Sequence, residues 1–292
     1  MKPHRPVTLC HCKGPNFGDS LNPLIFERVL GMSVKSCYKQ PLKARVLGIG
    51  TIIGKGLLRP RKSLLRAGLY HFLSPLHVFS SGITGDWSSG EAAPMRKMIC
   101  HAVRGELTKE QLIALGVLEA QADVVLGDAG LLAPFLLEKK PAKQYACAIV
   151  PHVADQGLPS VLQMHNTLKH SIVINVRDNP LKVLEQLAAS ELILASAMHG
   201  LIVADALGIP NQWVRFSEHP QIGGKGGRFK YHDYYSIYPN YPHEPIEPDA
   251  VLRTFLPELF INQFDPRKAC VQRAQQALLR AAEKMKAELE RG

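Results

Sequence analysis

Short apolar runs alternate with stretches of helical periodicity along most of this chain, and that alternation limits the possible folds more than any other feature. Strand–helix alternation is typical of α/β proteins with mostly parallel sheets, which gather ligands at the C-terminal ends of their strands. The predicted strands lie in VTLCH, RVLGIG, LHVFSSG and ADVVLGD in the first half, and in YACAIVPH, SIVINV, ELILAS and NQWV in the second. We therefore predict an α/β fold.

For three of the intervening helices the sequence contains signals that mark where the helix begins or ends. The opening loop, KGPNFGDS, leads into apolar positions at helical spacing that stop at Gly31. RGELTKEQLIALG is predicted as a helix with Thr108 and Gln111 in capping-box positions and Gly116 at its C-terminal end. HGLIVADALG follows the strand ELILAS directly and is predicted as a third helix.

A polar, proline-containing break, EKKPAKQ, separates the two series of strands. A chain of 292 residues has room for about two domains. We predict one α/β domain over residues 1–140 and a second over 141–265, facing each other, followed by an amphipathic helix over 266–292. That helix is predicted to pack against the body of the protein, and a coiled-coil dimer is the alternative.

The charge balance indicates the kind of partner. The chain has 35 Lys and Arg against 25 Asp and Glu, a formal charge of +10, which favours a phosphorylated metabolite, nucleic acid or an anionic membrane surface. Because the N-terminus lacks a signal-peptide core and no apolar run approaches the ~18 residues of a membrane span, we expect a cytoplasmic protein. Six scattered cysteines favour buried free thiols over disulfides or a zinc site.

Several familiar site motifs are incomplete or missing. GIGTIIGKG resembles a P-loop, but Ile49 and Gly56 stand where a glycine and a magnesium-binding Ser or Thr belong. The sequence has no Asp-x-Asp pair, no closely spaced metal-ligand cluster and no Gly-x-Ser-x-Gly elbow. We therefore expect neither a metal nor a cofactor.

Three polar clusters are expected at strand ends. His199 stands where ELILAS turns into a helix, so its ring should lie beside the free N–H groups of the helix start, a natural anion site. His152 ends a second strand, and the loop with Asp19 follows a third, so the three should converge on one rim. The alternatives are a core histidine at position 199 and a helix N-terminal carboxylate at position 19.

The order and spacing of these segments resemble the polysaccharide pyruvyltransferase family. The motifs that carry the resemblance are NFGDSLNP, GIGTII, FSSGITG, AVRGELT, VLGDAGLL, VPHVAD, SAMHGLIVADALGIP and FKYHDYYS, which together span residues 10 to 240. The resemblance implies two Rossmann-like domains around a central cleft, similar to GT-B glycosyltransferases. It also implies transfer of the enolpyruvyl carbons of phosphoenolpyruvate to two hydroxyls of a sugar, giving a cyclic pyruvate ketal and phosphate.

Ketal formation needs an acid, a base and cations that hold the donor, and no metal is obligatory. Because histidine transfers protons near neutral pH, His199 is predicted as acid or phosphate ligand and His152 as second choice, with Asp19 as base toward the acceptor hydroxyl. The predicted substrate-binding residues are Asn16, Gly18, Arg104, Arg177, Ser196, Gly200, Lys225, Arg228 and Lys230. The first domain is expected on the acceptor side and the second on the phosphoenolpyruvate side.

One position departs from the family pattern. Many members carry Arg-Leu-His where this chain has Ala197, Met198 and His199, so another cation must hold the donor's phosphate or carboxylate. The candidates are Arg104, Arg177, Arg215 and the basic residues of GGKGGRFK, which are Lys225, Arg228 and Lys230. A solvated flexible loop is the alternative for that glycine-rich segment.

Two other functions fit the same features. One is a nucleotide-sugar glycosyltransferase of similar architecture, and the other is a basic module that binds acidic glycans or lipid headgroups. The expected acceptor is an exopolysaccharide sugar or its lipid-linked repeat unit, and nucleic acid is not an expected partner. KGLLRPRKSLLR, residues 55–66, is predicted to contact an anionic membrane surface near the acceptor, with an ordinary solvated basic face as the alternative.

Overall fold

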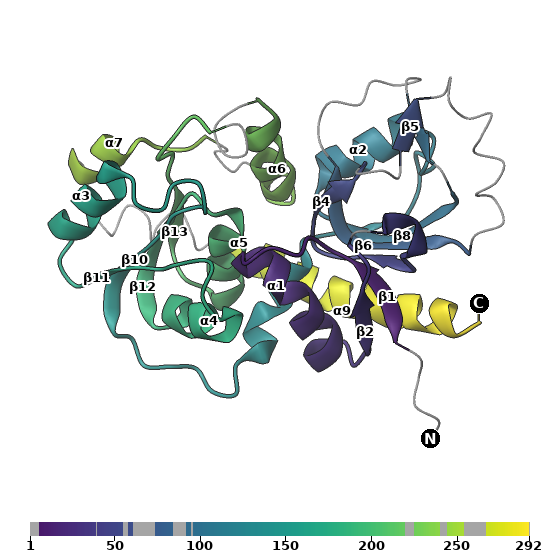
Figure 1. Cartoon of the computed structure of the whole chain (residues 1–292), viewed down its shortest axis with the longest axis horizontal. Helices are drawn as coiled ribbons and strands as arrows, with labels where there is room; N and C mark the ends of the chain where they lie inside the picture. The colour runs from purple at the N-terminus through teal and green to yellow at the C-terminus, as the bar shows by residue number, and fades with distance from the viewer. Residues whose placement is uncertain are drawn as a thin grey trace.

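Two parallel sheets with flanking helices form the core of the computed structural model (Figure 1). The structure describes residues 6–38, 40–54, 58–60, 74–83, 92–94, 96–219, 225–239, 244–253 and 267–291. The predicted α/β class with parallel sheets is therefore confirmed. None of the described helices combines the length and apolar character needed to cross a bilayer.

The first sheet has seven strands, all paired in parallel. Its main path runs β2-β1-β3-β6-β8-β9, and β4 pairs with β6 beside that path. These strands are β1 (Val7–Cys10), β2 (Val34–Ser36), β3 (Val46–Leu47), β4 (Gly50–Ile53), β6 (Leu76–Ile83), β8 (Met98–Val103) and β9 (Val125–Leu126). A separate antiparallel pair joins β5 (Leu58–Pro60) to β7 (Ala92–Pro94). The basic segment 55–66 otherwise lies outside the described residues.

The second sheet has four parallel strands in the order β11-β10-β12-β13. They are β10 (Tyr145–Val150), β11 (Ser171–Val173), β12 (Ser190–Ala195) and β13 (Asn211–Trp213). Each predicted strand of the second half is present. In the first half the segment RVLGIG is divided between β3 and β4, and ADVVLGD contributes only the two residues of β9.

Helices and helical turns connect the strands. They are α1 (Phe17–Leu24), the π-helical η1 (Ile25–Val29), η2 (Pro41–Lys43), α2 (Glu106–Ala114), η4 (Ala129–Leu136), α3 (Pro159–Thr167), α4 (Pro180–Ala188), α5 (Met198–Leu207), α6 (Lys225–Tyr235), α7 (Pro248–Arg253) and α9 (Lys268–Arg291). The opening helix ends before Gly31, whose φ of +65° suits glycine, as predicted. The segment 138–144 connects η4 to β10 without regular structure.

The predicted capping box of α2 is wrong. The helix begins at Glu106 after the extended residue Gly105, so Thr108 lies inside the first turn. Its hydroxyl donates to the carboxylate of Asp233 at 2.6 Å, because α6 packs against the start of α2. The predicted C-terminal end is confirmed, since Gly116 has a φ of +69° immediately after the last turn.

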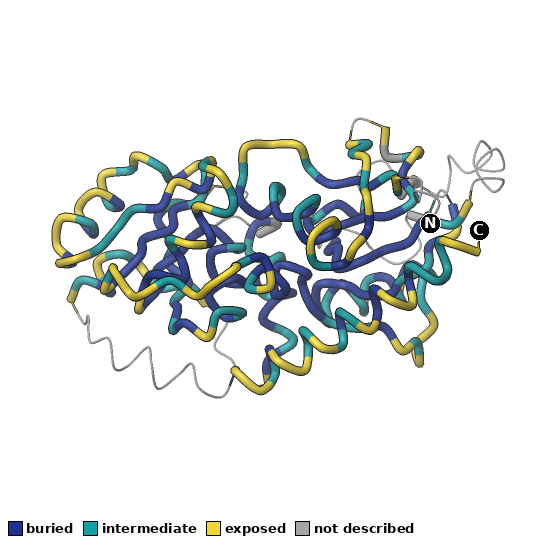
Figure 2. Tube along the Cα trace, turned by 90° about the horizontal axis from the view of Figure 1, so that it is seen from below, coloured by how far each residue is buried: buried dark blue, intermediate teal, exposed yellow. Residues whose placement is uncertain are grey.

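Helix α9 returns to the first sheet at the end of the chain. It packs on β8, β9 and η4, with Val271, Leu278 and Met285 buried along one face (Figure 1). The outward face is exposed, so the helix alternates between buried and exposed residues along its length (Figure 2). An amphipathic helix that packs against the body of the protein was the prediction, and the structure shows that contact.

Candidate active site

His199 lies in the first turn of α5, at the point where β12 ends. Its side chain is 14% exposed and occupies a narrow slot between α1 and η4. A Cβ added to Gly18 would lie 2.0 Å from His199 Nδ1, and one added to Gly130 would lie 3.4 Å from its Cδ2. The ring therefore packs on the backbone of the opening loop's helix, which brings two of the predicted clusters together.

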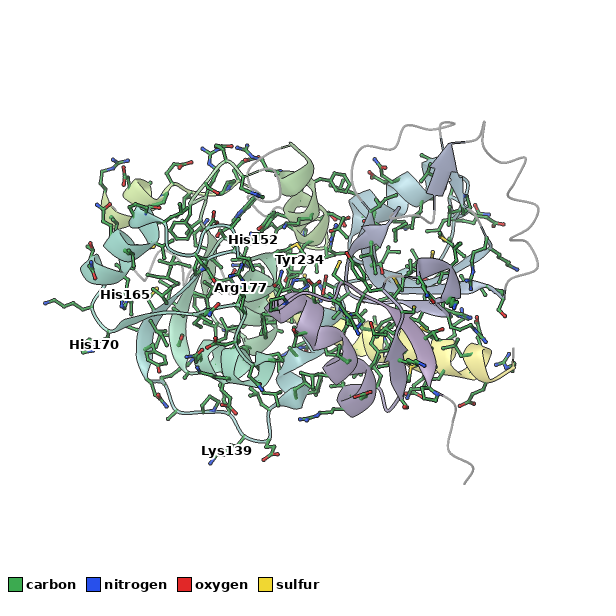
Figure 3. The ribbon with its side chains drawn as sticks, in the orientation of Figure 1. Lys139, His152, His165, His170, Arg177 and Tyr234 are labelled. Atoms are coloured by element: carbon green, nitrogen blue, oxygen red, sulfur yellow. The ribbon has the colours of Figure 1, made fainter. Side chains whose placement is uncertain are left out.

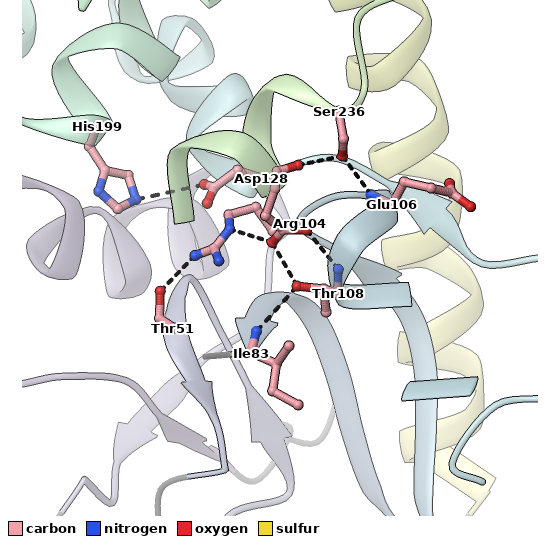
Figure 4. A network of polar contacts seen from close by, with 9 residues as sticks. Thr51, Ile83, Arg104, Glu106, Thr108, Asp128, His199 and Ser236 are labelled. Carbon is pink, nitrogen blue, oxygen red and sulfur yellow. Dashed lines mark hydrogen bonds and ion pairs between the residues drawn. The ribbon is translucent and has the colours of Figure 1, made fainter. Parts of the chain in front are cut away.

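Asp128 faces the other side of this imidazole, and sequence reasoning gave it no role. It follows β9 and caps η4, because its Oδ1 accepts a hydrogen bond of 2.8 Å from the backbone N–H of Gly130. The same Oδ1 lies 3.8 Å from His199 Nε2 (Figure 4). His199 Nε2 and Asp128 Oδ2 are both buried without a hydrogen-bond partner. The signal that could have found Asp128 is its place in VLGDAGLL, directly after a strand.

Burial sets the protonation of this pair. It raises the pKa of Asp128 to about 6, against the opposing effect of the Gly130 N–H. It lowers the pKa of His199 to about 3, and the positive charges of Lys230 and Arg104 lower it further. His199 is therefore neutral at pH 7 in the free protein.

Arg104 is fully buried below this pair (Figure 4). Its Nε donates to Asp233 Oδ2 at 2.8 Å and its Nη1 donates to Thr51 Oγ1 at 2.7 Å, while Nη2 is buried without a partner. A Cβ on Gly82 would lie 2.2 Å from the guanidinium, so glycine is required beneath it. Two of the Arg104 nitrogens thus hold the fold together, and Nη2 is the one left without a partner; its predicted contact with substrate stays a prediction.

Lys230, in α6, supplies the other cation near His199. Burial and the charge of Arg104 lower the pKa of Lys230 to about 8, while Asp19 and Asp155 act in the opposite direction. Among the described residues its ammonium has no hydrogen-bond or ion-pair partner, and it lies 5.2 Å from the centroid of the Tyr231 ring. Lys230 is thus a partly buried cation whose charge lowers the pKa of both His199 and His152.

His152 follows β10 (Figure 3). Because β10 and β12 pair in parallel, His152 and His199 lie at the same C-terminal edge of the second sheet. Its Nδ1 accepts a hydrogen bond of 3.2 Å from the N–H of Ala154, so the proton of the neutral ring resides on Nε2. Burial lowers the pKa of His152 to about 4, and Lys230 and His219 lower it further. His152 is therefore also neutral at pH 7.

Ser196 was predicted to bind substrate, but its polar groups are engaged inside the protein. The hydroxyl accepts from the His152 N–H at 2.9 Å and donates to Asp155, a fully buried residue that Ser217 also contacts. The carbonyl oxygen accepts from the hydroxyl of Tyr231. Ser196 therefore orders the loop that carries His152, and its contact with substrate stays a prediction.

The remaining predicted residues of the opening loop lie where α1 meets the second sheet. Asn16 precedes α1 and forms no side-chain cap, and Asp19 lies in the first turn of that helix. The N–H of Phe17 donates to the carbonyl of Val176 at 2.7 Å, which places the exposed Arg177 next to the start of α1 (Figure 3). Gly200 packs against Val150 inside α5.

Of three further predicted cations, two pair with surface carboxylates and the side chain of the third is not described. Arg228 pairs with Glu218 at 3.9 Å and with Glu244 at 3.7 Å. Arg215 bonds Glu247 through Nε at 2.7 Å and also pairs with Glu218. Lys225 is the first residue of α6, and its side chain is not described. Arg228 and Arg215 are held by surface carboxylates, which makes both poor donor ligands.

The family model for polysaccharide pyruvyl transferase matches residues 56–215, more than half of the chain. This chain belongs to that family. It is 28% identical over 220 residues to the succinoglycan biosynthesis protein ExoV of Rhizobium meliloti (strain 1021), a match that covers 75% of this chain and 60% of ExoV. It is also 31% identical over 120 residues to uncharacterized protein L143 of Acanthamoeba polyphaga mimivirus, covering 40% of this chain and 41% of that protein.

The matched region contains Arg104, Asp128, His152 and His199, and so includes most of the site. Gly18 and Lys230 lie outside it. The family resemblance inferred from the motifs is confirmed. The two relatives extend beyond the matched segments, and the chain spans 41% of L143 and 60% of ExoV.

One cluster with metal-binding spacing occurs among the residues that the structure describes, and it lies away from this site. It consists of His77 and His101, on neighbouring strands, and Glu288 of α9. His77 Nδ1 and His101 Nε2 are 2.8 Å apart and the ring planes differ by only 8°. Two stacked rings would hold these nitrogen atoms farther apart than 2.8 Å, so the two rings lie edge to edge in nearly one plane. The nitrogens then share one proton in a hydrogen bond, which leaves no room for a metal ion between them.

Proposed function

We propose that this protein transfers the enolpyruvyl group of phosphoenolpyruvate onto two hydroxyls of a sugar, forming a cyclic pyruvate ketal and releasing phosphate. The observation that carries the proposal is the placement of two cations, Lys230 and Arg104, beside a buried His199 at the N-terminus of α5. A helix N-terminus and two cations complement a small donor that carries both phosphate and carboxylate. We propose an exopolysaccharide or its lipid-linked repeat unit as the acceptor, and an association with the inner face of the membrane.

Lys230 is the proposed replacement for the arginine that many family members carry at position 197. Arg228 and Arg215 are held by surface carboxylates, and Arg104 offers one nitrogen. Lys230 has its ammonium available, and with a pKa of about 8 it is mostly protonated at pH 7. An anionic donor stabilises the charged form, so binding and protonation support each other.

The reaction requires proton transfer at carbon. The donor's methylene takes up a proton, one sugar hydroxyl bonds to the adjacent cationic carbon, and the second hydroxyl displaces phosphate. One hydroxyl proton thus ends on the new methyl group and the other leaves with phosphate. His199 is the proposed acid, and His152 and Asp19 are the proposed groups that remove the hydroxyl protons.

His199 can act as an acid only when the donor is bound. Its pKa of about 3 reflects burial and the charges of Lys230 and Arg104. A bound phosphate and carboxylate neutralise those two charges and add negative charge beside the ring, which raises the pKa of His199 toward neutrality. The imidazole is therefore protonated in the complex and not in the free protein, which ties proton transfer to donor binding.

We also propose the GT-B-like arrangement of two Rossmann-like domains, residues 1–140 on the acceptor side and 141–265 on the phosphoenolpyruvate side. Each proposed domain has its own parallel sheet, which supports the division. The donor pocket draws on both, because Arg104 and Asp128 belong to the first and His199 and Lys230 to the second. No cofactor is part of this proposal.

The test is a donor comparison on purified protein. Phosphoenolpyruvate is incubated with non-pyruvylated succinoglycan oligosaccharides, an acceptor suggested by the name of ExoV, and with lipid-linked repeat units. Phosphate release and the new ketal methyl signal in the proton spectrum are followed, with and without a chelator. We expect consumption of phosphoenolpyruvate, an increase of the melting temperature by that donor, and no loss with chelator.

Nucleotide sugars form the second arm. If a nucleotide sugar raises the melting temperature or is consumed and phosphoenolpyruvate does neither, the protein is a glycosyltransferase. If neither donor binds and the protein binds acidic glycans or lipid vesicles, it is a binding module.

A further inference from the structure

We propose that Asp128 is a positioning residue that accepts the Nε2 proton of His199 and thereby presents Nδ1 of the ring to the donor. The pairing is stated for the protein itself, and its catalytic meaning rests on the proposed function.

The geometry around the ring assigns the two nitrogens to different surroundings. Nε2 is directed at Asp128 Oδ1, 3.8 Å away, and has no other partner (Figure 4). Nδ1 lies against Gly18 in the first turn of α1, at the positive end of that helix's dipole. The side of the ring that faces an anion-binding helix start is thus the Nδ1 side.

Capping alone does not account for a carboxylate at position 128. The cap uses only Oδ1, which accepts from the Gly130 N–H, and Asn or Ser would serve that purpose equally well. Asp128 is fully buried and its Oδ2 has no partner, an arrangement that costs free energy unless another group uses the charge. The charged groups that act on Asp128 are Arg104 and Asp233, and these two are already paired with each other.

The distance of 3.8 Å is too long for a hydrogen bond in the free protein. Catalytic hydrogen bonds are often long without substrate and shorten in the complex. When the donor's charge favours the imidazolium, its Nε2–H gains a carboxylate acceptor and the ring is held by Asp128 on one side and by the donor on the other. The carboxylate keeps its charge throughout, and the proton that moves to the donor is the one on Nδ1.

The test combines tautomer measurement with kinetics. Uniformly ¹⁵N-histidine-labelled protein is examined by two-bond ¹⁵N–¹H correlation at pH 7, with His199→Gln used to assign the ring. We expect wild-type His199 as the Nε2–H tautomer. In Asp128→Asn the amide oxygen keeps both contacts of Oδ1 but carries no full negative charge, so we expect the preference for Nε2–H to weaken and the Nδ1–H form to become populated. Asp123→Asn, at an exposed carboxylate, is the matched control and should leave the tautomer unchanged.

With phosphoenolpyruvate and a competent acceptor, Asp128→Asn should lower kcat by about 10²–10⁴-fold with little change in KM, because the imidazolium loses the carboxylate that stabilises it. A wild-type Nδ1–H tautomer overturns the proposal, and so does an Asp128→Asn variant with unchanged tautomer and kcat. Lower stability with full turnover identifies Asp128 as a cap only. Because the tautomer is read without any substrate, failure of phosphoenolpyruvate as donor leaves this measurement decisive for Asp128.

Discussion

Arg104 and Asp233 form an ion pair in which both side chains are fully buried, with Arg104 Nε 2.8 Å from Asp233 Oδ2. Arg104 follows β8 of the first sheet, and Asp233 lies in α6, which stacks Tyr231 on Trp213 of the second sheet. Asp233 also accepts from the N–H of Thr108 at 2.7 Å. This pair therefore connects α6 to the first sheet while the other face of α6 contacts the second.

Removing one member of this pair should destabilise the fold. Asp233→Ala leaves the Arg104 guanidinium buried and uncompensated, and we expect a loss of about 3–5 kcal/mol in the free energy of unfolding. Urea denaturation measures it. Asp249→Ala, at an exposed aspartate in the first turn of α7, is the control and should cost no more than about 1 kcal/mol. Equal losses from the two variants would contradict the assignment.

His199→Ala should lower kcat by at least ~10²-fold while the melting temperature changes little, because the ring is expected to act on the donor. His199→Gln retains hydrogen bonding but transfers no proton at neutral pH, so it should be equally impaired. Turnover and thermal unfolding are measured on both. Near-normal turnover in the Gln variant would mean that His199 only positions the donor.

Lys230→Met retains the apolar stem of the side chain and removes its charge, so it should weaken the binding of phosphoenolpyruvate. We expect KM for the donor to rise by roughly 10- to 100-fold, as for a lost charge-assisted contact of about 1.5–3 kcal/mol. Lys182→Met is the matched control, since Lys182 is a 59% exposed lysine paired with Asp178. Donor affinity is measured by thermal shift and kinetics. A KM equal in both variants would assign the donor's charge to Arg104 or Arg177 instead.

Gly18→Ala should displace the His199 ring, because the added Cβ would lie 2.0 Å from Nδ1. The expected result is a loss of turnover larger than that of Gly31→Ala, where nothing lies within 4 Å of the added carbon. At Gly31 the positive φ makes the change one of stability instead, about 1 kcal/mol. Kinetics and urea unfolding of the two variants separate these effects.

Stability should fall as pH decreases from 7 toward about 4.5. His101 and His152 each have a pKa near 4, chiefly because burial disfavours the charged ring. Between that pKa and the ordinary value of 6.5 the unfolded chain binds protons that the folded protein does not, so protonation favours unfolding. His199 acts in the same direction, while Asp128, with a raised pKa of about 6, opposes it.

For His101, whose side chain is 1% exposed, the effect amounts to roughly 2–4 kcal/mol when fully developed. Urea unfolding at several pH values measures the slope. His101→Gln retains a partner for His77 and cannot be protonated, so it should reduce the slope. A slope that is flat in wild type, or unchanged in the variant, would rule out this account.

The position of His199 was predictable because its signal is local. ELILAS has the composition of a buried strand and HGLIVADALG begins a helix, so the turn between them falls at the C-terminal edge of the sheet. Parallel pairing then brings His152 to the same edge. The proposed reaction came from the order of the family's motifs, because neither hydrophobic periodicity nor net charge indicates a reaction.

Asp128 and Asp233 were not predictable, since their partners lie far away in the sequence. Asp128 faces a histidine 71 positions later, and Asp233 pairs with an arginine 129 positions earlier. Hydrophobic periodicity reports the faces of single elements and says nothing about such pairs. The ion pair of Arg104 was not predictable for the same reason, because the sequence does not distinguish an unpaired arginine from a buried, paired one.

Lys230 and Asp233 lie three residues apart on α6, so they share one face of the helix. One of them is proposed to hold the donor and the other anchors the helix to Arg104. Changes that loosen the anchor must therefore also move the donor-holding ammonium. Thermal stability and donor affinity are therefore coupled at this helix, and selection for either one will alter the other.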